Sequence, residues 1–101
     1  DIENNKLFVQ IEQMDSNLLK EMAQAIKNNK NLDVVFFASV AVDKVTFVCA
    51  TSDLFDASNL VKEASKLCQG GGGGKKNLAQ AGGKDVSKVS EAMAYVKELC
   101  K

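Results

Sequence analysis

The chain has 101 residues, with 13 lysines, no arginine and 13 acidic residues, so its formal net charge at neutral pH is zero. This length fits a single domain, which can bury a hydrophobic core but only a small one. The balanced charge excludes a strongly basic nucleic-acid-binding domain, so any contact with RNA has to come from a local patch or from shape. With 46% hydrophobic and 26% charged residues, and no segment of membrane-spanning length, the sequence is typical of a soluble globular protein.

The first half of the chain alternates between strand and helix patterns. Residues 6–11 are rich in β-forming side chains and predict a first strand. Asp15 or Ser16 can then cap a helix. Its apolar residues recur at helical spacing as far as Ile26, and the helix is expected to end in the Asn/Lys stretch 27–31.

A predicted hairpin follows. Residues 34–42 are nearly all apolar, which is typical of a central strand covered on both faces. Asp43 and Lys44 form a plausible tight turn, and residues 45–50 are a second apolar run. The short gap between the runs predicts an antiparallel pair.

Two more helices are expected in the second half. After a polar connection at 51–56, Ser58 can cap a helix that ends at Gln69. The last helix is expected to begin near Asp85 or Ser87 and to run to the end of the chain. Each helix carries one apolar stripe, formed by Leu60, Val61, Ala64, Leu67 and Cys68 in the first and by Val89, Ala92, Met93, Val96, Leu99 and Cys100 in the second.

The predicted order is therefore β-α-β-β-α, then a glycine loop and a strand within residues 70–83, then α. This order predicts the α/β (α+β) class: one compact domain over residues 1–101, with a small mixed sheet of three or four strands and three amphipathic helices. Because Asp1 stands where a complete protein would have methionine, we expect a fragment of a longer protein, without a signal or transit segment.

The three cysteines, Cys49, Cys68 and Cys100, are widely spaced in a chain that has no histidine. This spacing gives neither a zinc pattern nor a disulfide framework. A catalytic cysteine would need a nearby base, and the usual one is missing. We therefore expect buried free thiols in the reducing cytosol, and no metal site.

All seven glycines fall within residues 70–83, and this concentration is the most informative feature of the sequence. Glycine allows positive φ and close approach of other groups, and successive exposed N–H groups can form an anion-binding nest. Lys75, Lys76 and Lys84 lie at its edge without an intervening acid. This pattern suits the phosphates of a nucleic acid or a nucleotide. The alternative is a flexible linker, but the last helix needs the core of the preceding residues, which favours a structured loop.

Two common phosphate-binding loops do not match. Gly74-Lys75 ends a stretch similar to a P-loop, but Lys76 stands where a serine or threonine would bind magnesium. A P-loop and a dinucleotide fingerprint both follow a strand, whereas a helix is predicted before this glycine run.

Residues 70–83, GGGGGKKNLAQAGG, resemble the signature of the DHH-associated C-terminal domain in the form found in alanyl-tRNA synthetases. The apolar strand pair at 34–50, the stretch 59–63 and the final helix also follow the layout of that family. The resemblance implies a non-catalytic module that binds the elbow of tRNA(Ala) and assists aminoacylation and editing by upstream domains. It also implies a cytoplasmic parent that is an ATP-dependent alanine-tRNA ligase. ATP, magnesium and, as a further candidate, zinc would belong to the parent's other domains, so no cofactor is expected here.

The resemblance implies tRNA-binding roles only within the motif. The glycines would let RNA approach the backbone, the lysines would bind phosphates, and Gln80 would contact a base edge or a ribose hydroxyl. For Gln80 the alternative is a buried amide that braces the glycine turns; Gly82 and Gly83 are expected to serve the turn into the last helix, and Lys84 and Lys88 either extend the basic edge or are solvated surface residues. The candidate residues are Gly70, Gly71, Gly72, Gly73, Gly74, Lys75, Lys76, Gln80, Gly82, Gly83 and Lys84.

Alternative functions remain open from the sequence. One is a protein–protein module, by self-association as in some members of the family or by docking on the parent's other domains. Others are the nucleic-acid-binding domain of a DHH-type phosphoesterase or a free-standing alanyl-tRNA editing protein. The phosphoesterases usually carry a histidine in the glycine motif, and this chain has none. No acid–base pair or paired nucleophile is evident, so an enzyme is not expected.

Overall fold

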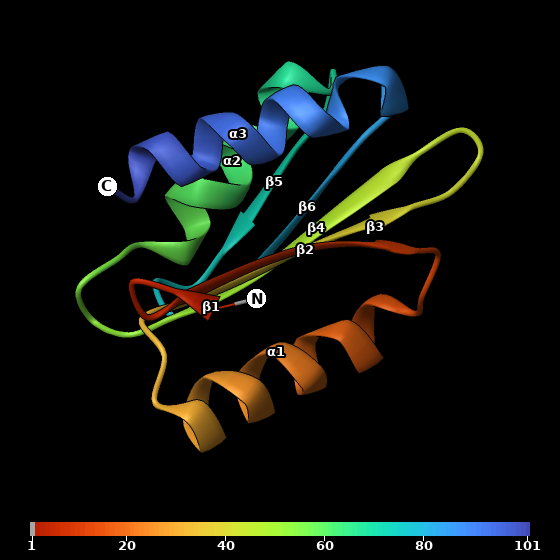
Figure 1. Ribbon diagram of the computed structural model, residues 1–101. Coiled ribbons are helices and arrows are strands. Elements are labelled where there is room, and N and C mark those ends of the chain that lie inside the picture. The colour runs from red at the N-terminus through yellow and green to blue at the C-terminus, as the bar shows by residue number, and fades with distance from the viewer. Residues whose placement is uncertain (1) are drawn as a thin grey trace.

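A six-stranded mixed sheet forms the middle layer of the fold in the computed structural model, which describes residues 2–101 (Figure 1). The spatial order of the strands is β1-β2-β3-β4-β6-β5. Their bounds are Ile2–Glu3 (β1), Lys6–Glu12 (β2), Val34–Val40 (β3), Val45–Thr51 (β4), Gly71–Gly74 (β5) and Leu78–Gly83 (β6). The helices are Ser16–Lys30 (α1), Ala57–Leu67 (α2) and Val89–Leu99 (α3), with a 3₁₀ turn at Val86–Lys88.

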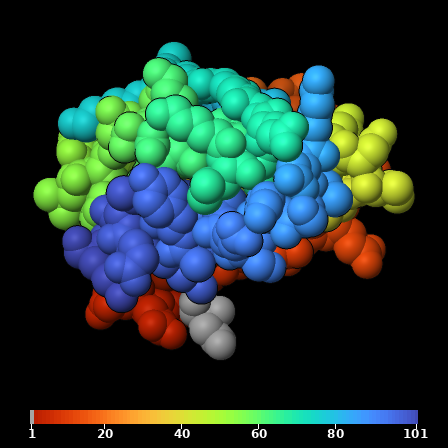
Figure 2. All heavy atoms as spheres, turned by 90° about the horizontal axis from the view of Figure 1, so that it is seen from above, coloured from red at the N-terminus to blue at the C-terminus, as the bar shows by residue number. Residues whose placement is uncertain are grey.

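Helices cover both faces of this sheet. The crossover through α1 joins the parallel strands β2 and β3, whereas the other neighbouring strands are antiparallel. Helix α1 packs on one face, and α2 and α3 pack together on the other (Figure 1). Figure 2 looks onto the second face, which the green and blue atoms of α2 and α3 cover densely. No helix within residues 2–101 is long and apolar enough to cross a membrane.

The position of β3 between helices on both faces of the sheet explains why its sequence is almost entirely apolar. Val34, Phe36 and Ala38 face the core under α2 and α3, whereas Val35 and Phe37 face the core under α1. All five are buried because helices lie on both sides. The predicted doubly covered strand and its antiparallel partner are confirmed. The strand ends at Val40 rather than at residue 42, because the Ala41 N–H donates to the Lys44 carbonyl (2.8 Å) and begins the turn.

The helix starts test the predicted caps. Asp15 caps α1, accepting from the Leu18 N–H at 3.2 Å. For α2 the prediction of Ser58 is wrong: Asp56 is the cap and accepts from the Asn59 N–H at 3.2 Å. The helix begins two residues early because the Ala57 N–H is held by the Lys76 carbonyl at 2.6 Å.

The glycine run is a strand rather than a loop, which corrects the predicted nest and raises the strand count above the expected three or four. Strand β5 pairs with β6 in the register Gly71↔Gly82 to Gly74↔Ala79. The two-residue β1 was also not expected. Gly82 and Gly83 end β6 instead of forming the turn into the last helix. Residues 70–83 therefore form a glycine hairpin, the name used below.

Hydrogen-bonded and non-hydrogen-bonded residue pairs alternate along the glycine hairpin, and this alternation determines which backbone groups of β5 are not bonded to β6. The Lys75 N–H donates to the Leu78 carbonyl at 2.9 Å, which makes this a hydrogen-bonded pair. Since such pairs alternate along an antiparallel ladder, Gly73 and Gly71 are also bonded to β6. Gly72 and Gly74 occupy the intervening positions, so their N–H and C=O groups point outward at the free edge of the sheet.

Gly72 and Gly74 are required by close approach to the neighbouring strand. Their φ angles are 155° and 157°. In this conformation an added Cβ would point at β6, 2.6 Å from the Ala81 Cα at one position and 2.9 Å from the Ala79 Cα at the other. Any side chain there would separate the two strands, so the glycine hairpin depends on the absence of a Cβ.

We predict that Gly72→Ala lowers the free energy of unfolding by roughly 1–3 kcal/mol, because the new methyl group collides with β6. Gly71→Ala is the matched control, since a Cβ at Gly71 meets nothing within 4 Å. Urea unfolding of both variants is the measurement. Equal stability of the two variants would contradict the assigned strand pairing.

Candidate nucleic-acid interface

Unequal coverage of the sheet leaves one part of it open. Helix α1 packs on β3 and β4, whereas α2 packs on β4, β5 and β6. On the side of α1, the glycine hairpin therefore has no helix over it, and a hollow of about 590 Å³ lies there. Lys20 of α1, Thr46 of β4, and Gly71, Gly73, Gly74, Lys75, Leu78, Ala79, Gln80, Ala81 and Gly82 of the hairpin line this hollow.

A second hollow of about 530 Å³ continues the first toward the start of α1. It shares Thr46 and Gln80 with the first and adds Lys44 from the turn between β3 and β4. We call the two together the sheet groove. Three lysines, Lys20, Lys44 and Lys75, and one acid, Asp15, line it, so the groove keeps a net positive charge in a protein of zero net charge.

Gln80 lies at the middle of the sheet groove. It is half-buried on the same face of the sheet as Thr46. Its side-chain amide has no hydrogen-bond partner among residues 2–101, and none of its polar atoms is both buried and unpaired. An amide that can both donate and accept is therefore presented to whatever enters the groove.

The predicted lysines do not form one cluster. Lys75 and Lys76 lie in the turn of the hairpin, and that turn is held in place because the Lys76 carbonyl also accepts from the Thr51 hydroxyl at 3.0 Å. Lys84 follows the far end of β6, and its N–H donates to the Cys68 carbonyl at 2.8 Å. Six residues of extended strand separate the two sites by roughly 20 Å. Lys88 forms an ion pair with Glu91 (3.3 Å), as a solvated surface lysine would.

Gly70 and Gly83 serve packing rather than access to the groove. A Cβ on Gly83 would lie 2.6 Å from the Cβ of Cys68, at the end of α2, and one on Gly70 would overlap the Gly82 carbonyl oxygen. Both lie outside the lining of the sheet groove. Gly83 therefore lets β6 lie directly against the end of α2, and Gly70 lets the two ends of the hairpin approach each other.

Sequence reasoning missed Lys20, Lys44 and Thr46 as residues of the groove, and assigned Lys44 only to a turn. Thr46 carried a signal, because it is the single polar residue within the apolar run 45–50 and therefore marks a place where the strand is not covered. Lys20 carried none: its place at the groove depends on how α1 crosses the sheet.

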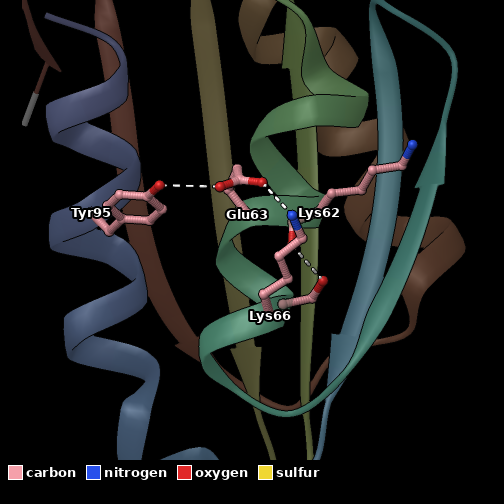
Figure 3. A network of polar contacts seen from close by, with 5 residues as sticks. Lys62, Glu63, Lys66 and Tyr95 are labelled. Atoms are coloured by element: carbon pink, nitrogen blue, oxygen red, sulfur yellow. Dashed lines mark hydrogen bonds and ion pairs between the residues drawn. The ribbon is translucent and has the colours of Figure 1, made fainter.

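The opposite face carries a polar network between α2 and α3 (Figure 3). The Glu63 carboxylate pairs with the Lys66 ammonium at 2.8 Å and accepts from the Tyr95 hydroxyl at 3.1 Å. The hydrogen bond from Lys66, and then that from Tyr95, lowers the pKa of Glu63. The same carboxylate raises the pKa of Lys66 and of Tyr95. Lys62 takes part in this network only through its carbonyl, which accepts from the Ser65 hydroxyl at 3.0 Å, and its side chain points away, across the glycine hairpin (Figure 3).

The three cysteines are buried free thiols, as the sequence predicted. Burial, with smaller contributions from Cys100 and Asp56, raises the pKa of the Cys49 thiol well above its usual value. A protonated thiol enclosed in the core is a poor nucleophile. Within residues 2–101 there is no cluster of three or more His, Cys, Asp or Glu side chains that could hold a metal ion.

Residues 4–101 match the DHHA1 domain. The chain belongs to the DHHA1 family. It is 41% identical over 102 residues to an alanine–tRNA ligase of Clostridioides difficile (strain 630), a match that covers 96% of this chain and 12% of that protein. It is 44% identical over 100 residues to the corresponding ligase of Geobacillus kaustophilus (strain HTA426), covering 94% and 11%.

A solved structure extends the comparison to three dimensions. The C-Ala domain of the alanyl-tRNA synthetase from Aquifex aeolicus superposes with a TM-score of 0.84 and 35% identity, covering 92% of this chain and 87% of that one. Because the DHHA1 chain spans only about an eighth of the ligases it matches, the homology concerns one domain of those enzymes.

The raised pKa of Cys49 leads to a prediction for alkaline pH. The folded state holds the thiol proton more tightly than the unfolded state, so this stabilisation is present below the unfolded pKa of about 8.5 and is lost as pH rises above it. Between pH 7.5 and 9.5, the free energy of unfolding should therefore fall more in the unmodified protein than in Cys49→Ala. The expected difference is on the order of 1 kcal/mol. Urea unfolding at both pH values is the measurement, and equal decreases would contradict the prediction.

Proposed function

We propose that this DHHA1 domain is the tRNA-docking module of an alanyl-tRNA synthetase, a cytoplasmic ATP-dependent alanine–tRNA ligase, and that it catalyses nothing by itself. The relatives named above are alanine–tRNA ligases, which supports this parent. The module would hold no cofactor, since ATP and magnesium act in the parent's other domains. Its partners would be tRNA(Ala) and those upstream domains.

The observation that carries the proposal is the sheet groove beside the glycine hairpin. One edge of the groove is a strand without side chains, so a ligand can reach the backbone itself. Lys20, Lys44 and Lys75 supply ammonium groups to which phosphate oxygens can bind. Gln80 supplies an amide able to bind a base edge or a ribose 2′-hydroxyl, the group that distinguishes RNA from DNA.

The proposed docking point is the elbow of the tRNA, at the outer corner of its L shape. A site with few lysines in a neutral domain favours recognition of shape over long-range attraction. Binding by the isolated domain should consequently be weak, with a shallow dependence on salt. Docking the elbow would hold one tRNA for both the aminoacylation and the editing site of the parent.

The first test removes the charge of the hairpin turn. In a titration with tRNA(Ala) transcript, Lys75→Ala combined with Lys76→Ala should weaken binding and reduce the slope of log K against log salt by up to about 2, because up to two phosphates lose their cations. Lys88→Ala combined with Lys101→Ala removes the same charge from the α3 side of the molecule and is the control. Unchanged binding in the hairpin variant would rule out the proposed site.

The second test asks whether the elbow is what the domain recognises. The unmodified protein should bind full tRNA(Ala) more tightly than an isolated acceptor-stem hairpin, which lacks the elbow, at low and at moderate salt. Equal binding to both RNAs would mean nonspecific attraction. Binding to neither would instead favour a protein–protein module, and sedimentation at several concentrations would then test self-association.

A further inference from the structure

Lys62 lies across the glycine strand on the side opposite to the sheet groove. It projects from α2 and is exposed. Figure 3 shows it extending over the hairpin formed by β5 and β6. A Cβ built on Gly73 would be 3.1 Å from the Lys62 Cε and 3.9 Å from its Nζ. The lysine stem therefore occupies space that a side chain on the strand would otherwise fill.

Unlike Lys66 on the same helix, the Lys62 ammonium has no acidic partner within residues 2–101. The nearby carboxylate of Glu63 is already bound by Lys66 and Tyr95 (Figure 3). Ser58, one helical turn earlier on α2, adds a hydroxyl whose Oγ would be 3.3 Å from a Cβ on Gly73. Two donors of α2 thus meet at the same glycine.

The free edge of β5 adds backbone donors beside this pair. Gly72 and Gly74, on either side of Gly73, are exposed, and their N–H groups point away from β6. An ammonium group, a hydroxyl and outward-facing backbone amides form a set of donors that suits an anion.

We propose that Lys62, with Ser58 and the outward amides of Gly72 and Gly74, binds one phosphodiester group of RNA at the free edge of the sheet. The proposal rests on the proposed function for the source of that phosphate, and it adds a contact on the α2 side. RNA would then lie along the edge of β5, with Lys75 on the groove side and Lys62 on the α2 side. Gly73 would matter because a methyl group there would lie 3.1 Å from the Lys62 Cε and 3.3 Å from the Ser58 Oγ, so that both side chains would have to shift.

The first experiment compares Lys62→Gln with Lys66→Gln, a control one turn further along the same helix that removes the same charge. In a titration with tRNA(Ala), Lys62→Gln should weaken binding by roughly threefold to tenfold and reduce the salt slope by about 0.7–0.9, the value for one phosphate contact. Lys66→Gln should change neither by as much. Thermal unfolding should stay close to that of the unmodified protein in Lys62→Gln, since the side chain is exposed.

The second experiment tests whether Gly73 acts through Lys62. Gly73→Ala should weaken tRNA binding in the unmodified background but have no further effect in the Lys62→Gln background. In the Lys66→Gln background, which leaves Lys62 in place, Gly73→Ala should weaken binding as much as it does in the unmodified protein, and this is the matched control. Additive effects of Gly73→Ala and Lys62→Gln would overturn the proposed coupling.

The outcomes separate this site from the proposed function. If Lys62→Gln binds tRNA as well as the unmodified protein while the Lys75/Lys76 double variant binds weakly, the phosphate site at Lys62 is wrong and the docking function stands. If the unmodified protein does not bind tRNA at all, both proposals fail.

Discussion

The backbone pairing of the glycine hairpin is the constraint on which the rest of this end of the domain depends. At Gly72 and Gly74 the chain has a conformation in which any Cβ would collide with β6, and at Gly83 it lies directly against Cys68 of α2. The two strands of the hairpin, and the hairpin and the helix, can be this close only because these positions lack side chains. The same property leaves backbone groups exposed at the edge of the sheet. One structural requirement thus produces both the packing and the accessible surface.

Charge and helix coverage together explain how a neutral domain presents a cationic surface. Three lysines of the described chain are paired with acids on its outer helices: Lys66, Lys88 and Lys101. The lysines along the sheet groove and across β5 are not in these pairs. Because α1 stops short of the hairpin while α2 covers it, the unpaired lysines lie around a strand that a ligand can reach from its edge. The sheet groove and Lys62 lie on opposite faces of one thin element.

Much of the fold followed from periodicity. The three helices, the doubly covered strand β3, its partner β4 and the buried thiols were predicted, because apolar spacing reports directly which face of an element is buried. The glycine run was predicted as a loop and is a strand. Glycine has no side chain with which to show an alternating pattern, and β1 is too short to show one. The predicted cap of α2 was wrong because Asp56, two residues before Ser58, caps the helix, and the Ala57 N–H that follows donates to the carbonyl of Lys76, which is distant in sequence.

The sequence by itself determined that the glycine-rich segment matters, that its turn carries Lys75 and Lys76, and that the chain belongs with the DHH-associated domains. These are properties of residue type and order. Only the tertiary structure decided which residues meet. It brought Lys20, Thr46 and Lys62 to the hairpin from three other elements, and it moved Lys84 to the far end of β6. The physical reason is that an extended strand separates sequence neighbours by about 3.3 Å per residue, whereas packing of helices on a sheet brings distant segments into contact.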